Sequence, residues 1–406
     1  MKKRVVVTGI GAISSLGNNI AEMTDSLENG RVKYDAIPQD RFSTSHKLFA
    51  NNKGFMMDYG LYKDSWETDV SIMSEVAVKC ISEALESAQL SEEELEHYTA
   101  GLCIGTSVGA SFPILQRIKK TVEKNEDDYE LALYSTPKIL GKIARAFKLK
   151  GYVSAISTAC ASGTNSIGRA FDLIENGKAE IMISGGMDIF TELTYTGFNS
   201  LLAISKTKCK PFSNTRDGMS LGDGCAILIL ESLDSALARG AQIYAEIKGY
   251  HILNEAYHAT APHPDGKYAL KCMKSALAYG SMSVEDVDYI NAHGTGTGKN
   301  DSAELKACEA FLQEKTSKTF VGSTKCLTGH TLGAAGSIEA IISILSIMHN
   351  ALYANYDATD LPASEKIEFV TKNKSGIPLN TVLSNSFGFG GNMASILITK
   401  YNNQKN

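Results

Sequence analysis

The sequence is poor in proline and tryptophan: its 406 residues contain 8 prolines and 1 tryptophan, but 35 glycines. Average usage at this length would give roughly 20 prolines and 28 glycines. The glycines are therefore not part of proline-rich loops, and we expect them at tight turns and close backbone contacts. A hydrophobic fraction of 43% excludes a disordered or low-complexity chain. The length predicts two or three domain-sized units.

Metal-binding, nucleic-acid-binding and membrane-spanning patterns are also missing. None of the 8 cysteines forms a Cys-X-X-Cys motif or has zinc-site spacing to a histidine. The 40 basic and 45 acidic residues give a net charge of −5, which disfavours nucleic acid as a partner. The longest apolar run, Ile341 to Ile347, contains two serines and is far shorter than the ~20 residues that span a bilayer. We expect a cytoplasmic protein with reduced thiols that binds neither nucleic acid nor membrane.

Short apolar runs alternate along the chain with segments of helical periodicity. Residues 69–88 carry apolar side chains at helical spacing, and Ser91 followed by three glutamates is typical of a helix start. The short runs, several of which end in glycine, predict strands at residues 4–10, 100–104, 152–156, 180–184, 226–230, 244–250, 288–292, 382–385 and 394–399. This alternation predicts an α/β fold with partly parallel sheets, in which reactive groups collect at strand ends.

Two segments of the sequence resemble each other. Residues 158–174 place Cys160, and residues 328–348 place His330, before an apolar helix whose start is crowded with small residues. Small residues there let a helix pack closely against its neighbour. Chance similarity is an alternative, because helices rich in small residues are common. The shared position of a reactive side chain favours two related halves, which we place at residues 1–244 and 245–406.

Cys160 and His293 are the residues best placed for chemistry. Cys160 lies between a strand and a helix, where the helix dipole would stabilise a thiolate and make the thiol easier to ionise. The alternative is an inert buried cysteine. His293 follows a strand in a glycine-rich turn that matches no nucleotide-binding motif. It is either an imidazole presented by a rigid turn or a histidine without catalytic function.

Lys325 precedes His330 by five residues in an otherwise uncharged segment. Such a lysine is either a solvated turn residue or a buried cation with a partner. Glu339 lies among apolar residues of the following helix, where a carboxylate is costly unless it is paired. We therefore predict a Lys325–Glu339 ion pair. Residues 387–392 alternate phenylalanine and glycine, and form either a mobile aromatic loop or a tight turn.

Four motifs in this order, at residues 158–163, 291–297, 325–339 and 385–391, carry a resemblance to a known family. The chain resembles the β-ketoacyl-(acyl-carrier-protein) synthases of the Cys-His-His type and is similar to ketoacyl synthase II. The resemblance covers nearly the whole sequence. It implies a thiolase-like α/β fold with five layers, α-β-α-β-α, built from two related halves, and a homodimer.

The resemblance implies a condensing enzyme, an acyltransferase of fatty-acid elongation. Cys160 would hold the acyl group as a thioester, and malonyl-acyl-carrier protein would lose CO₂ and attack it to give 3-oxoacyl-acyl-carrier protein. His293 and His330 would donate hydrogen bonds to the malonyl thioester oxygen. Lys325, tied to Glu339, would hold the His330 region. The substrates would be carried on the phosphopantetheine of acyl-carrier protein, with no metal and no organic cofactor.

The resemblance also assigns the surroundings of the thiol. The cysteine's own backbone N–H and that of Phe389 would form an oxyanion hole, and Phe389 would act as a gate. Thr295 and Thr297 would bind the phosphopantetheine arm. Val108 and Phe387 would line the acyl pocket.

Departures from the family pattern leave the pathway open. Gly298 stands where many members have proline, and residues 392–393 are Asn-Met in place of Thr-Asn. A ketosynthase of a specialised aryl-polyene or polyketide pathway is therefore an alternative, as is a heterodimer subunit paired with a chain-length factor. A degradative thiolase would need a second catalytic cysteine near the C-terminus, but the last cysteine is Cys326. A ketoacyl synthase III would have asparagine in place of His330.

Three lysines, Lys206, Lys208 and Lys210, lie close together in the sequence. Such a run is usually a solvated surface. An acidic carrier protein would suit it, because complementary charge steers association.

Overall fold

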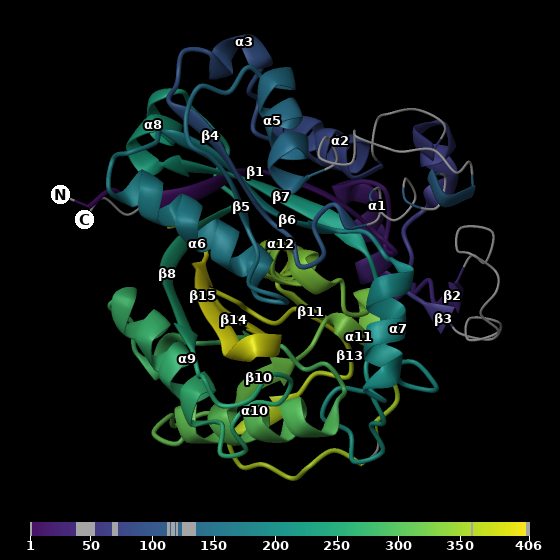
Figure 1. The fold of residues 1–406 in the computed structure, drawn as a ribbon. Coiled ribbons are helices and arrows are strands. Elements are labelled where there is room, and N and C mark those ends of the chain that lie inside the picture. The colour runs from purple at the N-terminus through teal and green to yellow at the C-terminus, as the bar shows by residue number, and fades with distance from the viewer. Residues whose placement is uncertain are drawn as a thin grey trace.

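The computed structural model describes residues 2–37, 53–66, 72–111, 135–358 and 360–402, together with residues 114, 118 and 121–123. In this part of the chain, eleven strands form one sheet in the order β12-β10-β9-β14-β15-β8-β1-β7-β6-β4-β5 (Figure 1). Their bounds are β1 Val5–Ser14, β4 Ala100–Gly105, β5 Val153–Ile156, β6 Ile181–Asp188, β7 Gly224–Ser232, β8 Ala245–Asn254, β9 Tyr289–Asn291, β10 Thr319–Gly322, β12 Ile367–Phe369, β14 Thr381–Gly388 and β15 Asn392–Thr399. Two small ribbons pair β2 (Asp35–Ala36) with β3 (Lys53–Gly54) and β11 (Ala351–Asn355) with β13 (Lys372–Ser375).

The sheet consists of two sets of five strands with the same topology. In the first set, β1, β4, β5, β6 and β7, the spatial order is third, second, fourth, fifth, first, and the fifth strand is antiparallel to both neighbours. The second set, β8, β9, β10, β14 and β15, repeats this order and these directions. The two first strands pair antiparallel across the junction, and β12 extends the far edge. The predicted α/β fold with internal repetition is confirmed, whereas the boundary between residues 244 and 245 stays a prediction.

Helices complete five layers. Figure 1 shows α2 (Ile72–Ser87) and α5 (Thr136–Ala146) beyond the first half of the sheet, and α9 (Lys267–Tyr279) and α10 (Gly298–Phe311) beyond the second. Between the halves lie α6 (Ser162–Glu175) and α12 (Ala335–His349). Each of these two helices follows the third strand of its half and precedes the fourth, although β11, β12 and β13 come between α12 and β14. The two segments that resemble each other in sequence therefore occupy equivalent positions in the fold.

The shorter helices mostly cap or connect these layers. At α3 (Glu92–Leu95) the Ser91 hydroxyl accepts the Glu94 N–H at 3.1 Å, and the Glu94 carboxylate accepts the Ser91 N–H at 2.7 Å. The predicted helix start at Ser91 is thus confirmed. Helix α2 is described from Ile72, and the first three residues of the predicted helix at 69–88 lie outside the described residues. The remaining elements are α1 Ile20–Glu28, α7 Glu192–Ser200, α8 Leu233–Ala238, α11 Lys325–Thr328, and the 3₁₀ helices η3 Tyr59–Trp66, η5 Val284–Asp286, η6 Leu332–Ala334 and η7 Phe389–Gly391.

Strand β1 contains Gly9 and continues to Ser14, past Gly11, at which the sequence predicts its end. A Cβ at Gly9 would lie 2.2 Å from the Ala84 carbonyl oxygen, and a Cβ at Gly11 would lie 2.3 Å from that of Cys80. Both carbonyls belong to α2, so these glycines let the helix pack directly on the strand. The expectation of a strand end there is wrong, because close packing and not a turn requires glycine.

One described segment, Leu332–His349, is long and apolar enough to cross a membrane, with a hydropathy of 1.5. It extends beyond the apolar run Ile341 to Ile347 on both sides. In the structure 89% of it is buried inside the fold, where it forms η6 and α12. The segment is therefore a core helix that lies between the two halves of the sheet.

The contact between α6 and α12 depends on glycine. A Cβ at Gly336 would lie 2.0 Å from Thr164 Oγ1 and 2.8 Å from the Thr164 nitrogen. A Cβ at Gly163 would lie 2.7 Å from the Gly333 carbonyl oxygen. The two helices therefore approach each other more closely than side chains larger than hydrogen would allow, and this brings their N-terminal ends together.

We expect Gly336→Ala to lower the free energy of unfolding by about 1–3 kcal/mol, because an overpacked core must shift its backbone. Urea unfolding of the purified variant measures this change. Gly197→Ala is the matched control, since Gly197 lies in α7 and a Cβ there meets nothing within 4 Å. The control should be neutral or stabilising by up to about 1 kcal/mol. Equal unfolding midpoints for the two variants would contradict the close contact.

Candidate active site

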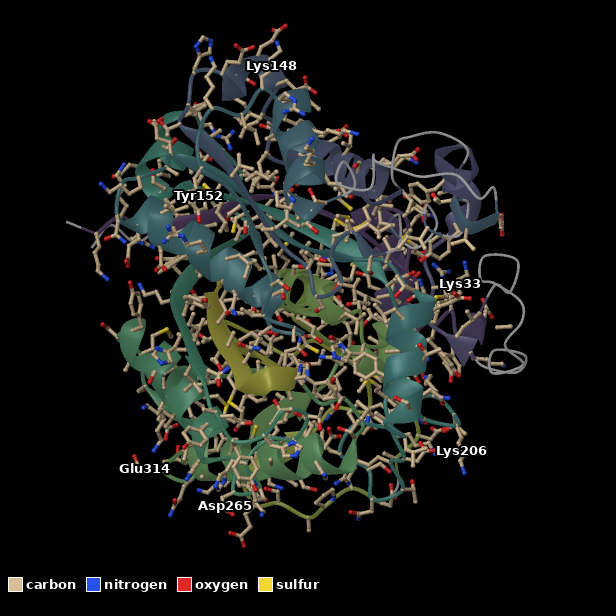
Figure 2. All side chains as sticks on the ribbon, viewed as in Figure 1. Lys33, Lys148, Tyr152, Lys206, Asp265 and Glu314 are labelled. Atoms are coloured by element: carbon tan, nitrogen blue, oxygen red, sulfur yellow. The ribbon has the colours of Figure 1, made fainter. Side chains whose placement is uncertain are left out.

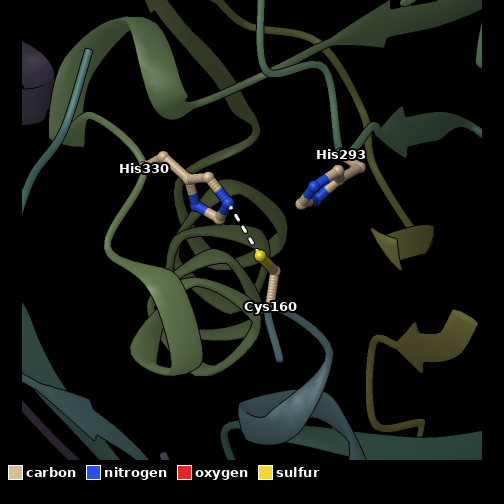
Figure 3. Close-up of side chains that lie close together, drawn as sticks. All are labelled: Cys160, His293 and His330. Carbon is tan, nitrogen blue, oxygen red and sulfur yellow. Dashed lines mark hydrogen bonds between the residues drawn. The ribbon is translucent and has the colours of Figure 1, made fainter. Parts of the chain in front are cut away.

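Cys160, His293 and His330 meet in the interior, between the two halves (Figure 3). His330 Nε2 lies 3.1 Å from Cys160 Sγ, and the two imidazole rings face each other edge to face with centroids 5.3 Å apart. One donor atom from each residue lies within 4.8 Å of the others, a set that could also bind a soft divalent metal such as Zn²⁺. The structure thus brings together the three residues that sequence analysis singles out.

Each of the three side chains is placed by a turn at an element end. Cys160 lies in the turn between β5 and α6, after Ala159, whose φ of 51° is unusual for a residue with a side chain. The Ser162 hydroxyl accepts the Thr158 N–H at 2.8 Å and closes this turn. His293 follows β9, and His330 follows α11, with its N–H donating to the Ser220 carbonyl at 2.7 Å.

The Cys160 thiol is harder to ionise than the sequence predicts. Burial raises its pKa to about 11, although the positive charge of Lys325 and the backbone N–H groups of Phe389 and Cys160 lower it. Loss of hydration raises the pKa by more than the N-terminal end of α6 lowers it, because α6 begins two residues after the thiol. The expectation of an easily ionised thiol is wrong. At neutral pH the thiol is protonated, and His330 Nε2 is placed to take its proton.

Alkylation of Cys160 by iodoacetamide should therefore accelerate about tenfold per pH unit between pH 6 and 9, since the thiolate fraction rises tenfold per unit below the pKa. Mass spectrometry of the peptide that contains Cys160 measures this rate, and the Cys160→Ser variant shows the background. A rate that levels off near pH 7 would show that the thiol is easily ionised after all.

Lys325 fixes the protonation of His293. It is buried, donates a hydrogen bond to the Glu339 carboxylate, and has its Nζ 3.3 Å from His293 Nδ1. An ammonium group can only donate, so Nδ1 accepts and the ring proton is on Nε2. Burial and then the Lys325 charge hold the pKa of His293 well below its usual value, which keeps the ring neutral. The predicted ion pair is present. The Lys325 ammonium hydrogen bonds to Glu339 and His293, and within the described part of the chain it has no hydrogen bond to the His330 ring.

His330 is free to exchange its proton. Burial, and then the charge of Lys325, hold its pKa well below the usual value. Its Nδ1 is buried without a hydrogen-bond partner among the described residues. Nothing there fixes the tautomer, so Nε2 can accept the proton of Cys160 or donate to an oxygen in the same space.

The backbone N–H groups of Phe389 and Cys160 both act on Cys160 Sγ and lower the pKa of the thiol. A Cβ at Gly388 would lie 2.9 Å from the Cys160 nitrogen, so glycine allows the strand end of β14 to approach the thiol. Paired N–H donors at a nucleophile can bind a developing oxyanion.

A cavity of about 280 Å³ contains the thiol and extends to the surface. The Thr295 and Thr297 hydroxyls line it and bond each other at 2.9 Å, and Phe387 and Phe389 line it near the thiol. Val108 does not line this cavity. It packs partly buried against an apolar cluster formed by Ile37, Met56, Phe190, Tyr195, Met219, Leu221 and Leu332.

The three neighbouring lysines do not form one exposed patch. Lys208 is half-buried and its Nζ donates to the Asn355 carbonyl, and Lys210 is also half-buried. Lys206 is exposed, and Figure 2 shows it at the surface. Of the three, only Lys206 is exposed, because Lys208 hydrogen bonds to the backbone of β11 and Lys210 is partly covered.

Two buried carboxylates near the site are missing from the sequence predictions. Glu304 on α10 accepts the N–H groups of His293 and Gly294, each at 2.8 Å, and burial raises its pKa to about 7. Asp188, at the end of β6, accepts the N–H groups of Ser107 at 2.8 Å and Gly333 at 2.6 Å, and burial raises its pKa to about 6. An acid that ends an apolar strand was the signal for Asp188.

Comparison with known families decides the relationship. Residues 2–236 match the family described as "Beta-ketoacyl synthase, N-terminal domain", and residues 244–359 match "Beta-ketoacyl synthase, C-terminal domain". The chain belongs to the β-ketoacyl synthase family. This β-ketoacyl synthase is 34% identical over 411 residues to 3-oxoacyl-[acyl-carrier-protein] synthase 2 of Staphylococcus aureus, covering 98% of this chain and 99% of the relative. It is 35% identical over 420 residues to the Synechocystis protein of the same name, with 98% and 99% covered.

Solved ketosynthases share the fold. The AntDE:AntF structure, a type II PKS acyl-carrier protein in complex with its ketosynthase, matches with a TM-score of 0.89 at 28% identity, covering 99% of this chain and 100% of that one. A β-ketoacyl synthase from Burkholderia phymatum matches with a TM-score of 0.86 at 28% identity, covering 98% and 100%. Together with the repeated strand order, these matches confirm a thiolase-like α/β fold built from two related halves.

Proposed function

We propose that this β-ketoacyl synthase is a 3-oxoacyl-(acyl-carrier-protein) synthase, a condensing acyltransferase of fatty-acid elongation. It joins an acyl group on Cys160 to malonyl-acyl-carrier protein, releasing CO₂ and 3-oxoacyl-acyl-carrier protein. The observation that carries this proposal is the buried thiol 3.1 Å from His330 Nε2 and beside His293, in a chain 34% identical from end to end to a 3-oxoacyl-[acyl-carrier-protein] synthase 2.

The first half-reaction is acyl transfer. The Cys160 sulfur attacks the carbonyl carbon of the incoming acyl thioester while His330 Nε2 accepts the thiol proton. The N–H groups of Phe389 and Cys160 bind the oxyanion. When the C–S bond to the carrier breaks, the proton passes to the departing pantetheine sulfur, and His330 returns to its neutral form.

The second half-reaction is decarboxylation and condensation. The malonyl thioester loses CO₂, and the negative charge that builds on its thioester oxygen accepts hydrogen bonds from the Nε2–H groups of His293 and His330. Lys325, by donating to Nδ1, holds His293 in the tautomer that this step needs. The carbanion attacks the acyl thioester, the C–S bond to Cys160 breaks, and the thiolate regains a proton from solvent.

The repeated topology supports an acyl pocket at Val108. Val108 follows β4 as Thr295 follows β9, and these are the second strands of the two halves. Phe190 follows β6 as Phe389 follows β14, the two fourth strands. In the first half, the apolar cluster at Val108 thus occupies the position that the cavity wall with Thr295 and Phe389 occupies in the second half. We assign the pantetheine arm to the cavity with its threonines, and the acyl chain to the cluster, which must open to admit it.

We propose a homodimer that pairs through β5, which ends the sheet. Tyr152 and Val153 are 40% and 39% exposed there, and an edge strand offers unpaired backbone groups to a second copy. Sedimentation equilibrium should give the mass of two chains, and Val153→Lys should shift it toward one. A monomeric wild type, or a dimer that the lysine leaves intact, would contradict this interface.

The proposed reaction takes place in the cytoplasm and uses no metal and no organic cofactor. Decarboxylation itself generates the nucleophile, so no further electron sink is required. All eight cysteines are free and buried, which suits a reducing compartment.

The proposal is tested by mass spectrometry of the products formed from malonyl-acyl-carrier protein and a panel of acyl-carrier substrates that differ in chain length and unsaturation. A single extension by two carbons to the 3-oxoacyl product is expected. If no substrate is extended, the proposed function is wrong.

A second candidate, a polyketide or polyene ketosynthase, is favoured by one observation. The ishigamide ketosynthase/chain length factor structure matches with a TM-score of 0.87 at 30% identity. Repeated extension without reduction, or extension of polyunsaturated substrates alone, would support this candidate.

A further inference from the structure

Leu202 lines the cavity where it meets the surface, with an exposure and a backbone conformation that are both unusual for leucine. Its side chain is 88% exposed, and its φ is 52°, in the left-handed region that favours glycine. Leu201 beside it is 52% exposed. Both leucines line the cavity that reaches Cys160.

The backbone explains the positive φ. The Leu202 N–H donates to the Asn199 carbonyl at 3.0 Å, and the Ala203 N–H donates to the Phe198 carbonyl at 3.1 Å. These bonds close α7 in a Schellman ending, in which Leu202 holds the position that is usually glycine. The apolar residues that accompany such an ending, Phe198 and Ala203, both pack against the Val108 cluster. The helix ending therefore does not need the Leu202 side chain.

Other helices of the described chain end in the same way without an apolar residue. The same pair of hydrogen bonds is found at Gly30, Gly177 and Gly240, and at the exposed polar residues Gln89, Lys148 and Ser281. Among the described residues, only Leu202 combines a left-handed φ with a large exposed apolar side chain. The hydrogen bonds of the helix ending hold the backbone, but no described residue covers the side chain, which is therefore available to a binding partner.

We propose that Leu202, together with Leu201, is the apolar contact for the acyl-carrier protein that delivers the thioesters; this rests on the proposed function. The phosphopantetheine arm is covalently attached to its carrier. When the arm's thioester lies at Cys160, the carrier must rest on the outer end of the cavity, where these leucines are exposed. Lys299 is exposed and lines the same cavity as the two leucines, so a positive charge suited to an acidic carrier is present there, together with the exposed Asp217.

The test compares two substrates: malonyl-acyl-carrier protein from the same organism, and free malonyl-pantetheine, which has the arm but no carrier. In Leu202→Gly and Leu202→Asn, the KM for the carrier-bound substrate should rise about fivefold or more relative to the KM for free malonyl-pantetheine. Both substitutions suit a positive φ, so the thermal unfolding midpoint should not fall. Leu202→Met should restore carrier binding. Gln89→Gly, the same helix ending elsewhere, is the matched control and should change neither KM.

Binding of malonyl-acyl-carrier protein, measured by fluorescence anisotropy, should weaken by a similar factor in the glycine and asparagine variants. Unchanged carrier binding would overturn the proposal. An equal rise in both KM values would also overturn it, because Leu202 would then act on the arm and not on the carrier. If the wild type forms no 3-oxoacyl product, the proposed function fails, and the anisotropy comparison still decides whether Leu202 contacts the carrier.

Discussion

Replacing Cys160 with alanine should lower the rate of 3-oxoacyl product formation by at least about 10⁴-fold, because the variant cannot form the acyl thioester. Sγ is the atom on which the site converges: His330 Nε2 lies 3.1 Å away, and the N–H groups of Phe389 and Cys160 act on it. Transfer of a radiolabelled acyl group from acyl-carrier protein to the protein measures the loss. Alanine removes only the sulfur and leaves both imidazoles in place.

The variant also separates the two half-reactions. Because His293 and His330 remain, Cys160→Ala should still release CO₂ from malonyl-acyl-carrier protein while making no 3-oxoacyl product. Cys103→Ala is the matched control, since Cys103 is also a buried cysteine but lies in β4 outside the cavity. It should retain acyl transfer. Labelling of Cys160→Ala at the wild-type rate would show that another residue is the nucleophile.

Much of this site could be predicted from the sequence, because its parts are local. Each of the three reactive side chains lies in a short run of small residues that predicts a turn at a strand or helix end, namely Cys160, His293 and His330. The Lys325–Glu339 pair follows from charges placed in apolar surroundings. The similarity of the segments around Cys160 and His330 predicts their equivalent places in two related halves, although it says nothing of the strand order that makes them equivalent.

The errors concern properties that only the packed chain decides. The pKa of Cys160 depends on how far the second half of the fold excludes water from the thiol, and the start of the neighbouring helix in the sequence does not show this. Glycine in β1 looks like a turn until α2 is placed against it. Lys208 hydrogen bonds to the Asn355 carbonyl of β11, 147 residues away in the sequence. The role of Glu304 is not visible in the sequence, because it accepts the N–H groups of two turn residues ten and eleven positions earlier, which polarity along one helix does not show.

His293→Ala should slow malonyl decarboxylation by about 10²–10³-fold, the usual effect of removing one donor to a developing oxyanion. Its Nε2–H is available for this because Lys325 donates to Nδ1, and its pKa, held well below the usual value, keeps the ring neutral. Acylation of Cys160 should persist, since the proton acceptor at 3.1 Å is His330. Release of ¹⁴CO₂ from labelled malonyl-acyl-carrier protein and acyl labelling of the protein measure the two steps separately.

His349→Ala is the control for a histidine outside the cavity, and it should leave both rates unchanged. The comparison discriminates between the two imidazoles. If His293→Ala abolished acyl labelling but released CO₂ at the wild-type rate, His293 would be the base for Cys160 and the roles of the two histidines would be exchanged. The hydrogen bond from Lys325 argues against that exchange, because a His293 whose Nδ1 accepts from Lys325 already carries its proton on Nε2 and has no lone pair there for the thiol.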